Sequence, residues 1–124
     1  EAVQYSQRRH TFGKSIINHQ AIQFKLADMA TDIYASRVMT YNAASLKDLG
    51  LPYLQEASMA KLFASEACFR VASEALQIFG GAGYFQGANI ERYFRDARVT
   101  SIYEGTSEIQ RMVIARRIIE QYGI

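Results

Sequence analysis

The sequence predicts an all-α protein, an up-and-down four-helix bundle, and three observations support that class. Apolar residues recur at intervals of three and four over long stretches, which is the period of an amphipathic helix. The alternating, β-branched pattern of a strand is nowhere sustained over five residues. Pro52 is the single proline among 124 residues, of which 49% are hydrophobic and 21% charged. This composition fits one globular domain that is long enough to bury a core without disulfides or metal.

The first two elements are a helix that ends near Gln7 and a long helix from Asn18 to about Lys47. The chain opens inside a helical pattern, without the basic and apolar segments of a signal peptide, so we expect it to be a piece of a longer protein. The apolar face of the long helix repeats every three or four residues over roughly eight turns. Its members are Ile22, Leu26, Met29, Ile33, Tyr34, Val38 and Tyr41.

A second long helix is predicted from about Pro52 to Phe79, after a break at Gly50, so the two long helices form an antiparallel hairpin. Small residues repeat along one face, where another helix can approach closely. They are Ala60, Ala64, Ala67, Val71 and Ala75. Other faces are also apolar, so we expect burial from two directions, by the bundle and by another domain or subunit. Cys68, the single cysteine, is expected to be a small buried thiol.

Two glycines, one shorter helix and a last long helix complete the chain. Gly80 and Gly81 are predicted to cap the second long helix. A dinucleotide-binding glycine loop is excluded here, because it requires a strand before the glycines and a helix after them. A shorter helix is expected from Ile90 to Arg95, and the last helix from Glu108 to about Glu120. With the incomplete first helix, the long helices number four, as in an up-and-down bundle.

Charge and composition argue against several classes of function. The 14 basic and 12 acidic residues are interleaved, with a formal net charge of +2, so nothing indicates binding to nucleic acid. Two histidines separated by nine positions, together with one cysteine, give no spacing for a metal site. No window approaches the roughly eighteen apolar residues of a membrane span.

Glu104 is the candidate catalytic residue, because it lies on a turn directly before the last helix. Ser107 and Gln110 have the spacing of a capping box, so a rigid helix end is expected to hold the turn and aim the carboxylate. The alternative is a solvated glutamate favoured by the positive end of the helix dipole, and local spacing alone favours that alternative. Asp96 and Arg98 are expected to form ion pairs that hold the preceding loop.

Other polar side chains are candidate ligands of a nucleotide. Arg9 offers a bidentate fork for a pyrophosphate, and Thr11 offers a hydroxyl nearby. Gln77 offers an amide that could bind a base. Taken singly, each is better explained as an ordinary polar surface residue.

Taken together, six ordered motifs resemble the carboxy-terminal helical domain of the acyl-CoA dehydrogenases, and the resemblance covers essentially the whole chain. Agreement of six motifs in order is not expected by chance, although each is weak alone. The motifs are Tyr5-x-x-x-Arg9-x-x-Phe12-Gly13, Asn18-His19-Gln20, Lys61-x-Phe63-Ala64-Ser65-Glu66, Gln77-x-x-Gly80-Gly81-x-Gly83-Tyr84, Arg95-Asp96-Ala97-Arg98, and Ile102-Tyr103-Glu104-Gly105-Thr106-Ser107-Glu108-Ile109-Gln110.

The resemblance implies a flavoprotein oxidoreductase of fatty acid or branched amino acid breakdown. FAD would lie extended at a dimer interface, with an acyl-CoA thioester between the flavin and Glu104. Glu104 would be the base that removes the alpha proton while the beta hydride passes to the flavin. An electron-transferring flavoprotein is the implied acceptor, and a homotetramer, a dimer of dimers, the implied assembly. Glutamate at position 104 argues against isovaleryl-type enzymes, whose base lies on another helix, and the short loops favour the short- or medium-chain branch.

The resemblance also implies a role for individual positions. The residues matching FAD contacts are Arg9, Thr11, Phe12, His19, Gln20, Gln77, Gly81, Ile102, Thr106 and Glu108, of which Gln77 and Gly81 would reach the FAD of a partner subunit. Position 108 is Glu in some members of the family and Gln in others. The residues matching substrate contacts are Tyr103, Gly105 and Arg116. Arg116 could tune the base by its charge, and a solvent-facing arginine explains it equally well.

The domain expected over residues 1–124 lacks the family's amino-terminal helical domain and middle β-domain, which help to enclose flavin and substrate. We therefore expect that the chain alone does not turn over acyl-CoA. Two alternatives stay open: a relative that is an acyl-CoA oxidase or flavin monooxygenase, and a catalytically inert helical module for oligomerisation. The expected compartment is either a bacterial cytoplasm or a mitochondrial matrix.

Overall fold

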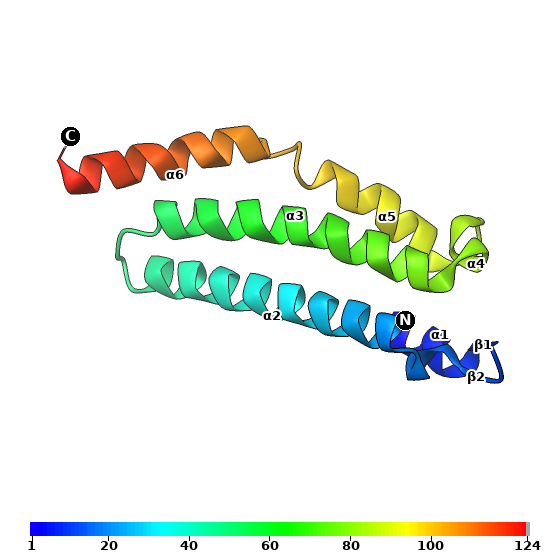
Figure 1. Ribbon diagram of the computed structural model, residues 1–124. Helices are drawn as coiled ribbons and strands as arrows, with labels where there is room; N and C mark the ends of the chain where they lie inside the picture. The colour runs from blue at the N-terminus through cyan, green and yellow to red at the C-terminus, as the bar shows by residue number, and fades with distance from the viewer. Residues whose placement is uncertain (124) are drawn as a thin grey trace.

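The computed structural model describes residues 1–123, and Ile124 of the predicted domain lies outside the described residues. The described part is helical apart from one small hairpin, which confirms the predicted all-α class (Figure 1). The α-helices are α1 (Ala2–Arg8), α2 (Gln20–Asp48), α3 (Leu54–Phe79), α4 (Gly81–Tyr84), α5 (Asn89–Val99) and α6 (Ser107–Tyr122). The antiparallel strands β1 (His10–Thr11) and β2 (Lys14–Ser15) and a 3₁₀ turn, η1 (Ile16–Asn18), separate α1 from α2.

The bundle is organised around α3. Helix α2 runs antiparallel to α3 on one side, and α5 and α6 follow one another along the other side (Figure 1). Helix α1 packs near the carboxyl end of α3, where the rings of Tyr5 and Phe79 stack with centroids 4.2 Å apart. The up-and-down arrangement is therefore confirmed, with α5 and α6 together forming one return path.

Small side chains explain why the other helices can approach α3 closely. Ala60, Ala67, Ala72 and Ala75 are buried along its length. At one end they join a core of larger residues contributed by η1, α2, α3 and α5. That core consists of Ile16, Met29, Ala75, Ile78 and Ile90. Three members of the predicted stripe, Ala60, Ala67 and Ala75, are thus buried at the contact surface of the central helix, whereas Ala64 and Val71 are only half-buried and line an open groove.

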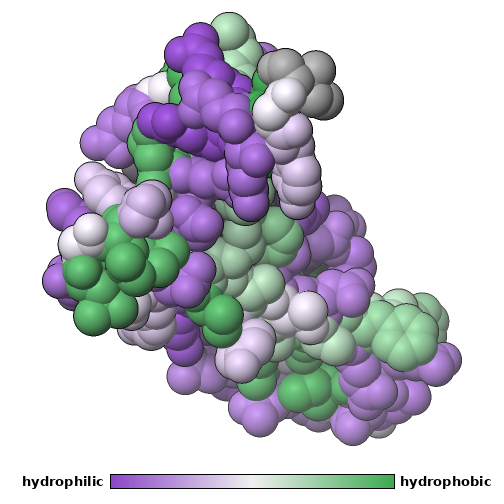
Figure 2. Space-filling model, turned by 90° about the vertical axis from the view of Figure 1, so that its left-hand side faces the viewer, coloured by the Kyte–Doolittle hydropathy of each residue, from purple (hydrophilic) through white to green (hydrophobic). Residues whose placement is uncertain are grey.

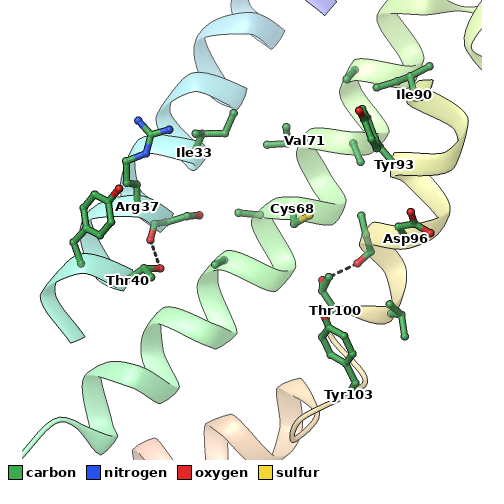
Figure 3. A pocket seen from close by; sticks show the side chains of 18 residues that line it. Ile33, Arg37, Thr40, Cys68, Val71, Ile90, Tyr93, Asp96, Thr100 and Tyr103 are labelled. Atoms are coloured by element: carbon green, nitrogen blue, oxygen red, sulfur yellow. Dashed lines mark hydrogen bonds between the residues drawn. The ribbon is translucent and has the colours of Figure 1, made fainter. Parts of the chain in front are cut away.

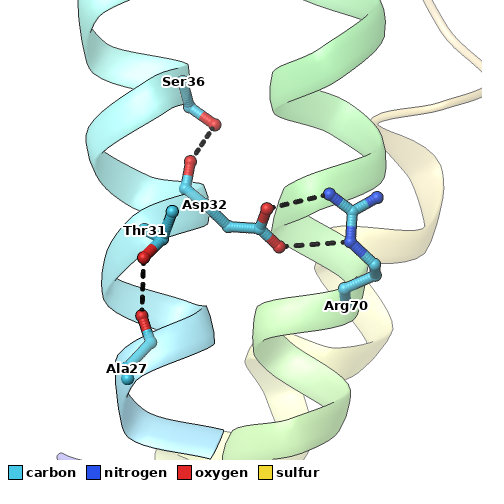
Figure 4. Close-up of polar contacts among 5 residues, drawn as sticks. All are labelled: Ala27, Thr31, Asp32, Ser36 and Arg70. Carbon is cyan, nitrogen blue, oxygen red and sulfur yellow. Dashed lines mark hydrogen bonds and ion pairs between the residues drawn. The ribbon is translucent and has the colours of Figure 1, made fainter. Parts of the chain in front are cut away.

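Cross-helix ion pairs fix the register of α2 against α3. Asp32 accepts two hydrogen bonds from the guanidinium of Arg70, at 3.0 and 3.1 Å (Figure 4). Lys25 donates to Glu74 two turns earlier on α2. Because these groups are partly exposed, each pair contributes only about 0–1 kcal/mol to stability, but together they favour one alignment of the hairpin.

Many large apolar side chains remain at the surface of the bundle. Seen from the end that carries the α2–α3 turn, hydrophobic residues reach the surface in several separate groups (Figure 2). In that turn Leu49 is 73% exposed and Leu51 48% exposed. On α2, Tyr34 and Tyr41 are 69% and 66% exposed. Such exposure is typical of a domain that contacts further protein.

Several helix ends differ from the predictions. Gly80 caps α3 with a φ of +58° as expected, but Gly81 begins the single-turn helix α4 instead of completing the cap. Helix α2 starts at Gln20 because residues 16–18 form a 3₁₀ turn. Helix α5 extends beyond the predicted residues 90–95, to Asn89 at one end and Val99 at the other.

Candidate active site

Glu104 lies on the loop between α5 and α6, with its side chain exposed. Its backbone has a φ of +54°, in the left-handed region that residues with a side chain rarely adopt. Gly105 follows with a φ of +90°. Two successive residues in this region turn the chain sharply into α6, and a strained non-glycine residue at such a position is a frequent mark of a functional site.

Side chains from two helices hold this turn. Lys61 of α3 donates from Nζ to the carbonyl oxygen of Gly105 at 2.7 Å. Gln110 of α6 donates from Nε2 to the carbonyl oxygens of Glu104 at 3.3 Å and Gly105 at 3.2 Å. The amide of Ser107 donates to the carbonyl oxygen of Ser101 at 3.1 Å and closes the loop. The backbone beside the candidate base is therefore fixed within the domain.

The predicted capping box at the start of α6 is wrong. Thr106 is the capping residue, and its Oγ1 accepts a hydrogen bond from the amide of Ile109 at 3.4 Å. Ser107 is the first helical residue, and its buried hydroxyl has no hydrogen-bond partner within the described chain. Gln110 reaches past the cap to the loop carbonyls. The left-handed Gly105 shifts the start of the helix by one residue.

The predicted ion pair of Asp96 and Arg98 is also wrong. Arg98 donates from Nη1 to the hydroxyl of Ser101 at 2.6 Å, and Arg95 pairs with Glu91 one turn earlier on α5. Within residues 1–123, Asp96 forms no ion pair and lies at the edge of a groove. The loop is thus held by a serine hydroxyl where an acid was expected.

Five of the residues predicted to contact a cofactor lie in or beside the β1–β2 hairpin. Thr11 Oγ1 and His19 Nε2 lie 3.0 Å apart, and the ring of Phe12 meets the His19 ring edge-on at 6.1 Å. Phe12 is 96% exposed and has a φ of +50°. Arg9, also exposed, directly precedes the hairpin. Gln20 is exposed at the first position of α2.

The other predicted cofactor contacts lie in two places. Gln77 and Gly81 are exposed where α3 ends and α4 begins, at the same end of the bundle as the hairpin (Figure 1). Ile102, Thr106 and Glu108 lie around the α5–α6 loop. Lys61, which contacts that loop, precedes Gln77 by sixteen residues, or roughly 24 Å along a helix. The two groups therefore lie far apart along the central helix.

Charge around the loop is unevenly distributed. A hydrogen bond from its own backbone amide and a second from the Thr106 hydroxyl lower the pKa of Glu108, which is fully exposed. Arg111 donates to Glu66 at 2.6 Å and ties α6 to α3. Arg116 is exposed and forms no ion pair within residues 1–123. It lies roughly 14 Å along α6 from Ser107, so the structure does not bring it close to Glu104.

An open groove of about 830 Å³ adjoins the loop, between α2, α3 and α5. Cys68 and Val71 project from α3 between the two flanking helices, and Tyr103, next to Glu104, lines one end (Figure 3). The prediction that Cys68 is buried is wrong, since it is exposed on this groove, where partial burial raises the pKa of its thiol. Apolar side chains make up most of the lining, which suits a hydrophobic occupant.

Comparison with known proteins accounts for this arrangement. Residues 1–119 match the family model of the acyl-CoA dehydrogenase carboxy-terminal domain. The chain belongs to the acyl-CoA dehydrogenase family. It is 52% identical over 121 residues to the mitochondrial short-chain specific acyl-CoA dehydrogenase of Rattus norvegicus, covering 98% of this chain and 29% of the rat enzyme.

Solved structures of acyl-CoA dehydrogenase relatives share the fold. The butyryl-CoA dehydrogenase of Megasphaera elsdenii superposes with a TM-score of 0.94 at 47% identity, over 95% of this chain and 31% of that one. An FAD complex of PigA superposes with a TM-score of 0.92 at 31% identity, over 94% of this chain and 30% of that one. The chain therefore spans less than a third of the length of these relatives.

This acyl-CoA dehydrogenase domain contains two contacts that sequence reasoning missed. Lys61 stood in one motif and Gln110 in another, but neither was assigned to the loop carbonyls. Lys61 lies 44 residues from Gly105, and Gln110 lies five residues from it. Neither separation produces a periodic pattern that a single sequence could reveal. Within residues 1–123 no cluster of His, Cys, Asp or Glu is arranged to hold a metal. None of the helices described is both long and apolar enough to cross a membrane.

Proposed function

We propose that this chain acts as the carboxy-terminal domain of an FAD-dependent acyl-CoA dehydrogenase, in which Glu104 removes the alpha proton of an acyl-CoA thioester. The observation that carries the proposal is the held left-handed turn at positions 104 and 105. It presents an exposed carboxylate from a backbone that three side-chain hydrogen bonds fix. Family membership supports the same reading.

The chemistry follows from the thioester. Its carbonyl group acidifies the neighbouring alpha carbon, and a carboxylate within hydrogen-bond reach of that carbon's proton can remove it. When bound, FAD supplies the oxidation by accepting the beta hydride. The carboxylate of Glu104 accepts and holds the alpha proton. The fixed turn keeps that carboxylate within reach of the alpha carbon.

The hairpin end of the bundle fits the nucleotide part of FAD. Arg9 presents an exposed guanidinium that matches a pyrophosphate, and Thr11 a hydroxyl on the neighbouring strand. Phe12 exposes an aromatic ring at the cost of an unfavourable backbone angle, which suits a residue that covers a flat ligand. Gln77 and Gly81 lie at this same end and are proposed to contact the FAD of a partner subunit.

The remaining predicted contacts are proposed for the flavin and substrate. Ile102, Thr106 and Glu108 would contact the flavin, and His19 and Gln20 would line the nucleotide site. Tyr103 and Gly105 would contact the acyl group, since Tyr103 lines the groove beside the loop. The position of Arg116 offers less support for direct contact, because it lies more than two turns from the start of α6.

Substrate, acceptor and assembly are inferred from the relatives. A short acyl chain is the proposed substrate, because the rat relative is named short-chain specific and the Megasphaera relative acts on butyryl-CoA. An electron-transferring flavoprotein is the proposed acceptor and a dimer of dimers the proposed assembly. The proposed location is a bacterial cytoplasm or a mitochondrial matrix.

The test is Glu104→Gln in the FAD-containing protein, assayed by butyryl-CoA-dependent reduction of a dye. We expect turnover to fall by about 10²–10⁴-fold, because the amide cannot accept the proton, while the flavin absorbance and the bound FAD are retained. Glu120→Gln, which changes an exposed glutamate on α6, serves as the control and should retain activity. Equal turnover in the wild type and Glu104→Gln would instead support the inert helical module.

A further inference from the structure

We infer that Lys61 and Gln110 are positioning residues for Glu104, which hold its backbone in the left-handed turn that presents the carboxylate. The inference rests on the proposed role of Glu104 as the base. It adds two side chains, from α3 and α6, that touch neither the acyl group nor the reacting atoms. Lys61 contacts the carbonyl oxygen of Gly105, and Gln110 contacts those of Glu104 and Gly105.

Lys61 makes the shorter of these contacts. Its ammonium lies 2.7 Å from the carbonyl oxygen of Gly105, which is 44 residues away in sequence. Within residues 1–123 it forms no ion pair, although Glu66 lies close in sequence and pairs with Arg111 instead. A charged donor to a backbone carbonyl makes a stronger hydrogen bond than a neutral one. Lys61 is half-buried and donates its charged hydrogen bond to a loop carbonyl, so it anchors that loop.

Gln110 contacts both carbonyl oxygens of the turn with one amide nitrogen. It also fills the space where Gly105 has no side chain, since a Cβ built on Gly105 would lie 2.7 Å from Nε2. The glycine and the glutamine thus depend on each other: the glycine leaves room for the amide, and the amide holds the glycine. The pair Arg111–Glu66, one residue further along α6, also joins the two anchoring helices.

The left-handed turn needs such anchors because it is unfavourable by itself. A residue with a Cβ is strained at a φ of +54° and relaxes toward negative φ when nothing opposes it. That rotation redirects the bond from Cα to Cβ and moves the carboxylate. A displacement of about 1 Å at a reacting group can reduce the rate by about 10²-fold. Loss of an anchor should therefore slow proton removal without removing the base.

The experiment compares Lys61→Met and Gln110→Glu with the wild type in the FAD-containing protein. Gln110→Glu keeps the shape of the side chain but removes the amide donor. We expect kcat with butyryl-CoA to fall by about 10–100-fold in each variant, with KM and bound FAD changed by less than about twofold. The isotope effect with alpha-deuterated butyryl-CoA should rise, because proton removal becomes slower relative to the other steps. Lys61→Arg, which retains a donor, should recover most of the rate.

A second readout does not depend on activity. The amide of Ser107 donates across the loop to Ser101, so its hydrogen exchange reports whether the turn stays closed. We expect exchange at Ser107 to become at least about tenfold faster in Lys61→Met and Gln110→Glu. Two matched controls, Lys25→Met and Gln121→Glu, make the same changes at a lysine and a glutamine elsewhere and should leave exchange, kcat and isotope effect unchanged.

The outcomes separate this inference from the proposed function. If Glu104→Gln abolishes turnover while Lys61→Met and Gln110→Glu keep kcat within twofold, the anchors are not positioning residues and the proposed function stands. If Lys25→Met lowers kcat as much as Lys61→Met, the effect is general destabilisation and the inference is wrong. If Glu104→Gln retains turnover, the proposed function itself fails.

Discussion

The α5–α6 loop and the β1–β2 hairpin both carry a non-glycine residue with positive φ, but they are supported differently. Glu104 is followed by a glycine whose carbonyl oxygen two side chains contact, and its own carbonyl oxygen is bonded as well. Phe12 sits at a hairpin tip with 96% of its surface exposed, and its ring meets only the edge of His19 at 6.1 Å. The domain itself holds the residue proposed for proton transfer. Phe12, the residue proposed to cover the cofactor, has little support from the domain, and we expect the bound cofactor to supply its contacts.

The difference reflects what each group has to do. A base acts on one proton, and its rate depends on position to a fraction of an ångström, so preorganisation within the domain is favourable. An aromatic ring that covers a large ligand gains its stabilisation from area, and the ligand itself supplies the contact. Hydrogen bonds within the domain therefore offset the backbone strain at Glu104. At Phe12, ligand binding is expected to offset it.

The largest expected effect comes from adding a methyl group at the glycine of each region. Gly105→Ala should lower the free energy of unfolding by about 2–4 kcal/mol, through the strain of positive φ and the loss of the Gln110 amide contacts that the methyl displaces. Gly13 also has a positive φ, but a Cβ added there would meet no atom within 4 Å. Gly13→Ala should therefore lower the free energy of unfolding by only about 1–2 kcal/mol. Chemical denaturation of both variants measures the difference, and equal losses would remove the distinction between the two regions.

A smaller effect, of opposite sign for stability and binding, is expected at the hairpin tip. Phe12→Asn should raise the free energy of unfolding by about 0.5–1 kcal/mol, because asparagine tolerates the left-handed region. FAD affinity should fall by about tenfold or more, because the apolar ring is lost. Thermal unfolding without FAD and titration with FAD give the two values. A variant that loses stability would mean that contacts at the tip already offset the strain.

The smallest effects separate two neighbouring residues of the held loop. Thr106→Ala removes the helix cap and should lower the free energy of unfolding by about 1 kcal/mol. Ser107→Ala removes a buried hydroxyl without a partner and should be neutral or stabilising by up to about 1 kcal/mol. Urea titration of the two variants decides between them. The capping box predicted from sequence requires the reverse order.

The helices were predictable because their signal is local and repeated. Four-and-three spacing along α2 and small residues along α3 are present in the sequence whatever the tertiary structure. The start of α6 was placed one residue late because Thr106 and Ser107 are both good caps, and only the φ of Gly105 selects between them.

Other features depend on which segments meet in space. Cys68 lies in a helical stretch that reads as buried, and its exposure follows from the groove left between α2 and α5. By contrast, the bond from Arg98 to the Ser101 hydroxyl spans only three residues, and this local contact takes the place of the predicted ion pair with Asp96. Glu104 was found through ordered motifs, whereas its anchor Lys61 lies 44 residues from the carbonyl it contacts and carries no local signal.

The uninterrupted course of α3 has a consequence for how the sequence can change. This helix carries Lys61 beside the loop and Gln77 at the hairpin end, with no break between them. Inserting one residue between these positions would turn everything beyond it by about 100° and shift it by about 1.5 Å. The interval should therefore tolerate substitution but neither insertion nor deletion, while the exposed turn at residues 49–53 can change in length. The length of α3 between Lys61 and Gln77 thus sets the distance between the loop and the hairpin end of the bundle.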